Sequence, residues 1–273
     1  HKVAHLSICA VASCIGKGLP RDDGSPTPHP VGAVREPPLQ AKESLDYLEK
    51  YGPVERKSFV GVRRAIAQRL SKTTGGATPL VTHFDLADVT KLDDVRKKQK
   101  ATYMPFIIKA VVAALKEHPM LNAALDESTN EIVYLKYYNV GIAVDTPAGL
   151  MVPVIKDADK KNVAELGEAL TGIAERARTR KISLDEMRGG SFTISNVGAV
   201  GGIYATPLMN YPQSAILALG RIRQEPLVRE GKVEVGKVLP LSCTFDHRIV
   251  DGADAARFCN KVGEVLSQPE TLS

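Results

Sequence analysis

The densest group of residues that could do chemistry is Asp246–Gly252, which reads Asp-His-Arg-Ile-Val-Asp-Gly. It follows an apolar run that starts at Val238 and precedes a helical pattern, so it is predicted to be a turn at a strand end, where functional side chains often lie. His247 could act as a general base, because the unperturbed pKa of imidazole, about 6.5, lies near neutrality. Asp251 could orient His247 or anchor the loop. A capped turn whose histidine only satisfies backbone groups remains an alternative on spacing alone.

A second group runs from Gly189 to Gly202 and places glycines on both sides of a short apolar strand, Phe192–Ser195. Such glycines indicate that the backbone closely approaches a ligand or a neighbouring chain. The glycine spacing does not fit a dinucleotide-binding fingerprint. Ser195 could donate a hydrogen bond to a developing oxyanion, and an ordinary strand-end serine is the alternative.

Cysteine chemistry is not expected. Cys243 and His247 share one face of the predicted strand, but four residues separate them by roughly 13 Å, too far for direct proton transfer. Cys243 is therefore predicted to be a small core residue. The other cysteines are Cys9, Cys14 and Cys259, which are too scattered for a disulfide framework and have no partners that complete a zinc site. Reduced thiols in a cytoplasmic protein without a bound metal are the expectation.

The elements that must position these residues follow from composition and periodicity. The 273 residues are 44% hydrophobic and 25% charged, which is ordinary globular usage, and no apolar stretch approaches the roughly 18 residues of a membrane-spanning helix. The net charge of +5 is spread among interspersed signs, so nucleic acid is not implied. Six prolines between Pro20 and Pro38 predict an extended arm over residues 1–40, followed by one α/β domain over 41–273.

Within that domain, apolar spacing predicts alternating strands and helices. A helix carries Val62, Ile66 and Leu70 as an apolar stripe, and Asp88 and Asn162 are expected to cap two further helices. The expected strands are Leu80–Leu86, Val140–Val144, Leu150–Ile155, Phe192–Ser195, Ser214–Leu219 and Val238–Asp246, and the remaining helices are Phe106–Glu117 and about Ala253–Leu266.

Taken together, the motifs resemble the catalytic domain of the dihydrolipoyl acyltransferase component of 2-oxo acid dehydrogenase complexes. The family signature Asp-His-Arg-x-x-Asp-Gly stands at Asp246–Gly252, and Phe-Thr-Ile-Ser-Asn-x-Gly stands at Phe192–Gly198. Further segments familiar from this family are Arg64-x-Ile-Ala, Asp88-Val-Thr-x-Leu-x-x-x-Arg96, Met104-Pro-Phe, Ile142–Val154 and Thr206-Pro207. The resemblance covers about residues 50–268 and favours functional roles for His247 and Ser195.

The resemblance implies a chloramphenicol-acetyltransferase-like, CoA-dependent acyltransferase fold, in which helices pack on a mixed sheet in two layers. It also implies homotrimers with active sites at the subunit interfaces, where His247 of one chain faces Ser195 of the next. His247 would be the base, Ser195 the oxyanion donor and Asp251 a loop anchor paired with a basic residue. Arg96 is the expected contact for a CoA phosphate. CoA would be the co-substrate, and a lipoyl group on a separate domain would bring an acetyl or branched-chain acyl group.

The resemblance further implies partners and leaves alternatives open. The trimers could build a 24- or 60-subunit core, although the chain ends at Ser273, short of the apolar tail that joins trimers in this family. The decarboxylase and dihydrolipoyl dehydrogenase components are the expected partners, in the cytoplasm or the mitochondrial matrix. No lipoyl domain is recognised, because Asp159-Lys160-Lys161 precedes a helix instead of forming a hairpin tip. A non-catalytic core subunit and a small-molecule O-acetyltransferase are the alternatives.

Overall fold

A computed structural model describes residues 44–73, 78–147 and 149–272. The predicted arm over residues 1–40 lies outside the described residues. Within them, the α-helices are α1 (Gly61–Thr73), α2 (Thr90–Lys98), α3 (Tyr103–Glu117), α4 (Val163–Arg178) and α5 (Gly252–Ser267). The strands are β1 (Val54–Ser58), β2 (Leu80–Asp88), β3 (Ala123–Asp126), β4 (Glu131–Leu135), β5 (Val140–Ile142), β6 (Val144–Thr146), β7 (Gly149–Met151), β8 (Val154–Ile155), β9 (Phe192–Asn196), β10 (Ala215–Leu219), β11 (Arg223–Arg229) and β12 (Lys232–Asp246).

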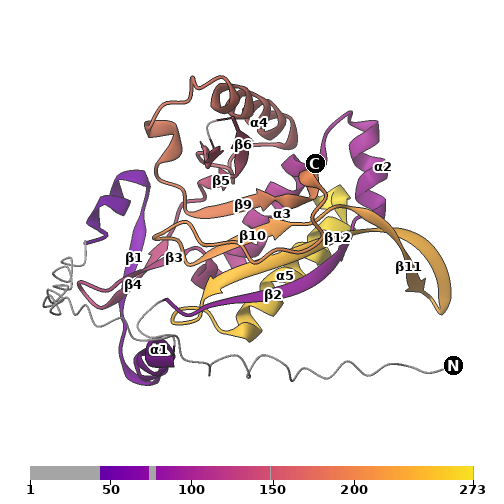
Figure 1. The fold of residues 1–273 in the computed structure, drawn as a ribbon. Helices are drawn as coiled ribbons and strands as arrows, with labels where there is room; N and C mark the ends of the chain where they lie inside the picture. The colour runs from indigo at the N-terminus through magenta and orange to yellow at the C-terminus, as the bar shows by residue number, and fades with distance from the viewer. Residues whose placement is uncertain (1–43, 74–77, 148, 273) are drawn as a thin grey trace, which may run out of the picture. The chain divides into compact units, whose positions relative to one another are not determined.

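The central sheet has the order β11-β12-β10-β9-β5-β8, and β2 pairs with the second half of β12 on its other side (Figure 1). Strand β9 runs parallel to both β5 and β10, whereas β12 is antiparallel to β2, β10 and β11. The sheet is therefore mixed, as predicted.

Helices α3 and α5 pack together against one face of this sheet (Figure 1). The largest fully buried side chains at this layer boundary come from both helices and from the strands: Phe106, Phe192, Phe245 and Phe258. The rings of Phe192 and Phe258 lie 5.8 Å apart. Burying such side chains contributes roughly 2–3 kcal/mol each, so this layer boundary holds β9 and β12 firmly in place.

Two smaller sheets stand apart from the central one. Strands β1, β4 and β3 form an antiparallel sheet in that order, and β6 pairs with β7. The sequence patterns did not predict the three-stranded sheet. They did predict strands over Val140–Val144 and Leu150–Ile155, and the structure breaks each of these into two short strands, at Ala143 and at Val152–Pro153.

The predicted helix caps had different outcomes. Asn162 caps α4 as predicted, and Glu165 completes a capping box by accepting a hydrogen bond from the Asn162 backbone N–H. The prediction for Asp88 was wrong in detail, since Val89 is the N-cap residue of α2 and makes no side-chain capping bond. Asp88 instead ends β2 and accepts hydrogen bonds from the backbone N–H and hydroxyl of Thr90.

The apolar stripe predicted for α1 is only partly buried. Ile66 is exposed, and Ala67 is the buried residue of this helix. The side chains of Val62 and Leu70 lie outside the described part of the chain. Of the three predicted stripe residues, the structure therefore tests Ile66 alone, and the buried position lies one residue further along the helix.

Candidate active site

Asp246 ends β12, and the loop from Asp246 to Gly252 connects this strand to α5. The backbone N–H of His247 donates to the carbonyl of Pro79 at 3.0 Å, which continues the ladder between β12 and β2 beyond the last paired residue. The N–H groups of Ile249 and Val250 both donate to the carbonyl of Asp246. His247 therefore stands on a fixed turn. Its ring lies 5.6 Å from that of Phe245, and 27% of its side chain is exposed.

Arg248 ties one side of the loop to the rest of the domain. Its guanidinium group donates to both carboxylate oxygens of Asp246, at 2.6 to 3.0 Å, and also contacts Glu127 in the turn between β3 and β4. Asp246 additionally accepts from the Arg248 backbone N–H at 2.9 Å. Such bidentate, charge-assisted pairs fix orientation as well as position.

Arg63 of α1 ties down the other side of the loop. Its guanidinium group donates to the carbonyl of Ile249 and to Oδ2 of Asp251, both at 2.7 Å. Arg63 is thus the basic partner that the sequence led us to expect for Asp251. The other oxygen of Asp251 lies 4.0 Å from Nδ1 of His247, which is too long for a hydrogen bond. Nδ1 is buried and has no hydrogen-bond partner among the described residues.

Nothing in the residue spacing could have identified Arg63. It lies 188 residues before Asp251. The next residue, Arg64, carries the same charge, so the sequence does not distinguish Arg63 as the partner. Only the fold brings α1 to the end of β12.

Ser195 lies at the end of β9, between β5 and β10. The nearby glycines do permit a close backbone approach, and the structure shows to what: a Cβ on Gly198 would lie 2.5 Å from the carbonyl group of Gly220. The close neighbour is therefore another segment of the same chain. The Ser195 side chain is half-buried, and its hydroxyl makes no hydrogen bond within the described part of the chain.

His247 and Ser195 do not meet within one chain. Ser195 is paired with Ala218 on β10, which is paired with Ser242 on β12, so two strand spacings of about 4.8 Å separate Ser195 from Ser242. His247 lies five residues beyond Ser242, roughly 17 Å further along the strand. The two residues are therefore about 19 Å apart, at opposite ends of the sheet.

Cys243 is a core residue, as predicted. A hydrogen bond with the Cys259 thiol and burial together raise its pKa well above the ordinary thiol value. Both cysteines are fully buried, so neither is available as a nucleophile.

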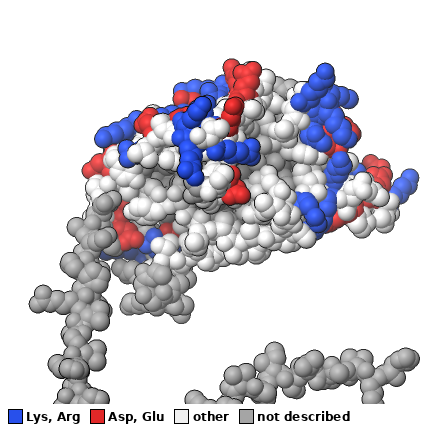
Figure 2. Space-filling model, turned by 45° about the horizontal axis from the view of Figure 1, so that its top comes forward, with Lys and Arg blue, Asp and Glu red and all other residues white. Residues whose placement is uncertain are grey.

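Arg96 lies on α2 within a cluster of charges around Asp93. Its guanidinium group bonds Asp93 at 2.5 Å and lies 4.2 Å from the centre of the Tyr103 ring. Lys97 and Lys237 also contact the Asp93 carboxylate. Burial of Asp93 favours its neutral form, but the hydrogen bonds from these cations and from Tyr103 outweigh that effect and hold its pKa well below the usual range. Figure 2 shows Lys and Arg side chains gathered over α2, at the upper right.

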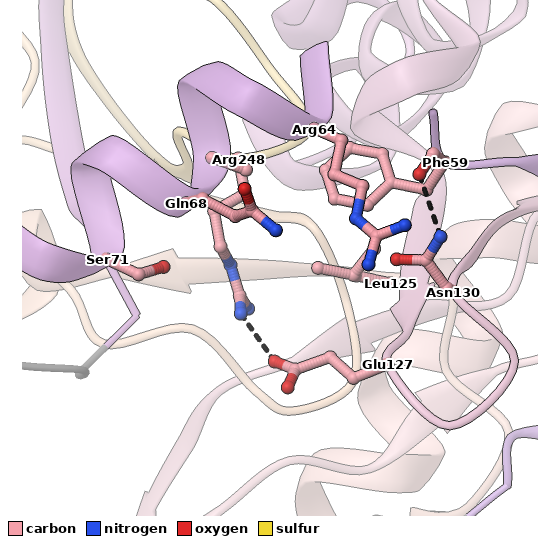
Figure 3. A pocket seen from close by; sticks show the side chains of 9 residues that line it. Phe59, Arg64, Gln68, Ser71, Leu125, Glu127, Asn130 and Arg248 are labelled. Carbon is pink, nitrogen blue, oxygen red and sulfur yellow. Dashed lines mark hydrogen bonds and ion pairs between the residues drawn. The ribbon is translucent and has the colours of Figure 1, made fainter. Parts of the chain in front are cut away.

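A cavity of about 560 Å³ lies behind the His247 loop (Figure 3). Arg64 and Gln68 of α1 point into it over an apolar floor that includes Phe59 and Leu125, and the Arg248–Glu127 pair closes one side. Neither His247 nor Ser195 lines this cavity.

No group of three or more His, Cys, Asp or Glu side chains in the described residues is arranged to hold a metal ion. Nor is any described helix long and apolar enough to cross a membrane.

The chain is similar to known proteins over most of its length. A family model described as "2-oxoacid dehydrogenases acyltransferase (catalytic domain)" matches residues 51–273. The dihydrolipoyllysine-residue acetyltransferase component of the pyruvate dehydrogenase complex of Bacillus subtilis is 42% identical over 229 residues, which are 81% of this chain and 52% of that protein. The protein of the same name from Staphylococcus aureus is 42% identical over 234 residues, 82% of this chain and 54% of the relative. The chain thus spans about half the length of the curated relatives it matches.

Solved structures agree with this similarity. The dihydrolipoamide acetyltransferase of Azotobacter vinelandii superimposes with a TM-score of 0.70 at 35% identity, covering 87% of this chain and 99% of that one. Chloramphenicol acetyltransferase, at 14% identity and a TM-score of 0.51, covers 78% of this chain and shares the fold, as predicted. With a family match over residues 51–273 and relatives at 42% identity, the chain belongs to the 2-oxoacid dehydrogenase acyltransferase family.

Proposed function

We propose that this chain transfers an acyl group from a dihydrolipoyl thioester to the thiol of CoA. The observation that carries this proposal is the position of His247 at a strand end, in a chain of this family. Hydrogen bonds of Arg63 and Arg248 hold its loop on both sides. The histidine backbone is fixed, while 27% of the side chain is exposed to solvent.

The Azotobacter vinelandii structure supports the roles of individual residues. It was determined to investigate a serine, a histidine and an asparagine in the catalytic mechanism of that enzyme. There, 52 residues separate the serine from the histidine, and four separate the histidine from the asparagine. The same two intervals separate Ser195, His247 and Asp251. We infer from these intervals that Asp251 corresponds to the asparagine, with Arg63 as the partner of its charge.

The chemistry follows from these groups. His247 takes the proton of the CoA thiol, and the resulting thiolate attacks the thioester carbonyl of the acyl-dihydrolipoyl arm. Because free thiol and imidazole pKa values differ by about 2 units, this transfer costs roughly 2.7 kcal/mol without assistance. The Ser195 hydroxyl donates a hydrogen bond to the oxyanion of the tetrahedral intermediate. His247 then returns its proton to the departing dihydrolipoyl sulfur, and the acyl group remains on CoA.

This mechanism requires two chains. Because His247 and Ser195 lie about 19 Å apart in one chain, the site is assembled from His247 of one subunit and Ser195 of the next. We propose a closed homotrimer. An apolar surface supports association, because Phe84, Leu86 and Tyr204 are exposed. Ala87 faces α5, so Phe84 and Leu86 lie on the opposite, solvent-exposed face of β2. Figure 2 shows a broad area without charged side chains below the charged upper part of the molecule.

Arg96 is proposed to contact a phosphate of CoA. Arg96, Lys97 and Lys237 together exceed the charge of Asp93, so the cluster is positive and suits a polyanionic ligand. Tyr103 and Asp93 hold the Arg96 guanidinium in one orientation, so it is available only at its outer edge.

The acyl group and partners are inferred from the relatives. The curated relatives at 42% identity are acetyltransferase components of pyruvate dehydrogenase complexes, so we propose acetyl as the transferred group. The lipoyl arm would come from a separate domain, and the decarboxylase and dihydrolipoyl dehydrogenase components would be partners. A relative at 36% identity forms the cubic core of its complex, which suggests a larger assembly of trimers here.

An assay with CoA and a panel of acyl-dihydrolipoamides tests the proposal. Acetyl-CoA formation from acetyl-dihydrolipoamide is the expected result. Acetylation only of small hydroxyl compounds would favour the O-acetyltransferase alternative, and absence of transfer to either acceptor would favour a structural core subunit.

A further inference from the structure

The cavity of about 560 Å³ behind the His247 loop has no part in the mechanism proposed above (Figure 3). Its size falls within the range of roughly 300–1,000 Å³ that is typical of small-molecule sites. Phe59, Ala67 and Leu125 give it apolar walls, and all three are buried. Arg64 reaches into it from α1. Apolar walls with a few polar groups at the edge are the usual lining of a site for a small organic molecule.

Arg64 carries the unpaired charge of this cavity. Its guanidinium group makes no hydrogen bond or ion pair within the part of the chain that the structure describes. The other two charged residues in the lining, Arg248 and Glu127, pair with each other. Arg64 therefore presents a free positive charge beside an apolar wall, where the local dielectric is lower than in bulk water and an anion is attracted more strongly.

The two sides of the cavity are held to different degrees. On one side, Asn130 in the turn between β3 and β4 donates from Nδ2 to the Phe59 carbonyl at 2.9 Å, and the Phe59 N–H donates to the Asn130 carbonyl at 2.8 Å. On the other side, Ala67 is the only buried side chain of α1 among those that the structure describes. A molecule in the cavity would therefore contact a fixed turn and a more loosely packed helix.

We propose that this cavity binds a monocarboxylate with an apolar chain, such as a medium-chain fatty acid. The carboxylate pairs with Arg64, and the chain lies on Phe59 and Leu125. A single negative charge matches a single free guanidinium group, which can donate two parallel hydrogen bonds to a carboxylate. An organic phosphate carries more charge than Arg64 alone can neutralise. The site is separate from the proposed acyl transfer, since neither His247 nor Ser195 lines it.

Calorimetric titration of the assembled protein with octanoate tests this site. The wild type should bind octanoate saturably, with a dissociation constant below about 1 mM. Arg64→Gln should weaken binding at least ~10-fold, because the carboxylate loses its cation. Octan-1-ol, which has the same chain length and no charge, should bind the wild type at least ~10-fold more weakly for the same reason.

Arg257→Gln is the matched control for Arg64→Gln. Arg257 is an exposed arginine on α5 that does not line the cavity, so its replacement should leave octanoate binding as in the wild type. Absence of saturable binding by the wild type overturns the proposal. Equal binding by Arg64→Gln, or equal binding of octan-1-ol, overturns it as well.

These outcomes are independent of the proposed function, because the titrations contain neither CoA nor a lipoyl substrate. A protein that binds octanoate through Arg64 and fails to transfer acyl groups overturns the proposed function and leaves this site in place. A protein that transfers acyl groups and does not bind octanoate overturns only the site.

Hydrogen exchange decides the question should Arg64→Gln fail to fold, because it needs only the wild type. Octanoate at about 10 mM, ten times the highest expected dissociation constant, should slow amide exchange in α1 and in the 127–130 turn about tenfold, since local opening would release the ligand. Exchange in α4, which lies outside this cavity, should not change. Unchanged exchange in α1, or equal slowing in α4, overturns the proposal.

Discussion

The two ends of the central sheet differ in how far the chain itself holds their candidate functional residues in place. At the His247 end, the chain supplies its own supports: Pro79 holds the histidine backbone, Arg63 holds the loop from α1, and Arg248 connects it to Glu127. At the Ser195 end, the serine hydroxyl makes no hydrogen bond within the described residues. The nearby ribbon of β11 and the first part of β12 exposes Val228, Val233 and Val235 to solvent.

The difference follows from what each end must do. A general base works only when its ring is held in one orientation, so the supports of His247 must exist before substrate arrives. An oxyanion donor must remain unsatisfied until charge develops, and the apolar surface beside it is available for a partner. In the proposed mechanism, the chain therefore fixes the loop of the base by itself and depends on a neighbouring subunit to place that base beside the serine.

Removing the base should have the largest effect. His247→Ala is expected to lower turnover at least ~10²-fold with folding intact, because a positioned base contributes that much. The variant His83→Ala, a histidine on β2 outside the loop, serves as the matched control and should keep turnover near that of the wild type. Near-normal turnover of a folded His247→Ala protein would contradict the mechanism.

Removing the oxyanion donor should cost about as much or slightly less. Ser195→Ala is expected to reduce kcat roughly 10²-fold with little change in the KM for CoA, because the hydrogen bond strengthens only as the carbonyl oxygen becomes charged. Steady-state kinetics with both substrates distinguish the roles. A raised KM with kcat preserved would make Ser195 a binding residue instead.

Loosening the His247 loop should have a smaller effect. Arg63→Met removes the hydrogen bonds to Ile249 and Asp251 and is expected to lower kcat roughly 10-fold while KM values change little, since only the placement of His247 is disturbed. Asp251→Asn keeps an oxygen acceptor for Arg63 and should lose less. Were Asp251→Asn as damaging as His247→Ala, the Asp251 charge would act on the imidazole directly, despite the 4.0 Å separation.

The smallest expected effect is on the free energy of unfolding, through the charge cluster in which Lys237 of β12 contacts the Asp93 carboxylate. The folded-state pKa of Asp93 lies well below its ordinary value, so its ionised form stabilises the fold above about pH 4, and this contribution is lost as the pH falls toward the folded-state pKa. Asp93→Asn should lower the free energy of unfolding by about 1–3 kcal/mol at pH 7.

Urea unfolding at pH 7 and pH 3 measures this effect. The difference between the wild type and Asp93→Asn should shrink at pH 3, because the carboxyl of the unfolded chain is largely protonated there while that of the folded chain stays ionised. The neighbouring variant Asp94→Asn is the control, since Asp94 is exposed. A difference that stays constant between the two pH values would show that the Asp93 charge is not what stabilises the cluster.

Much of the frame was predictable from the sequence because its signals are local. Apolar spacing and the Asn162–Glu165 cap identified α4, and the run from Val238 to Asp246 identified the strand that carries His247. The family resemblance then predicted roles for Ser195 and His247, which spacing alone left open.

The unpredicted features depend on contacts between distant segments. Arg63 reaches Asp251 only because α1 folds against the end of β12. The ribbon of β11 and the first part of β12 was not predicted. Its valines alternate as in an ordinary half-buried strand, yet they are exposed to solvent. Arg96 was predicted from the family pattern as a contact for a CoA phosphate, but its hydrogen bond with the buried Asp93 could not be predicted from spacing. In each case the contact depends on a segment distant in the sequence, and neither composition nor periodicity indicates which segment that is.

The shared site is tested most directly by subunit complementation. His247→Ala and Ser195→Ala proteins are unfolded together in equal amounts and refolded, so that mixed oligomers contain interfaces in which an intact His247 meets an intact Ser195. With random mixing, each intact partner is present with a probability of about one half, so about a quarter of the wild-type activity should return. No recovery, with subunit exchange verified by mass, would contradict the account, because both residues would then act within a single chain.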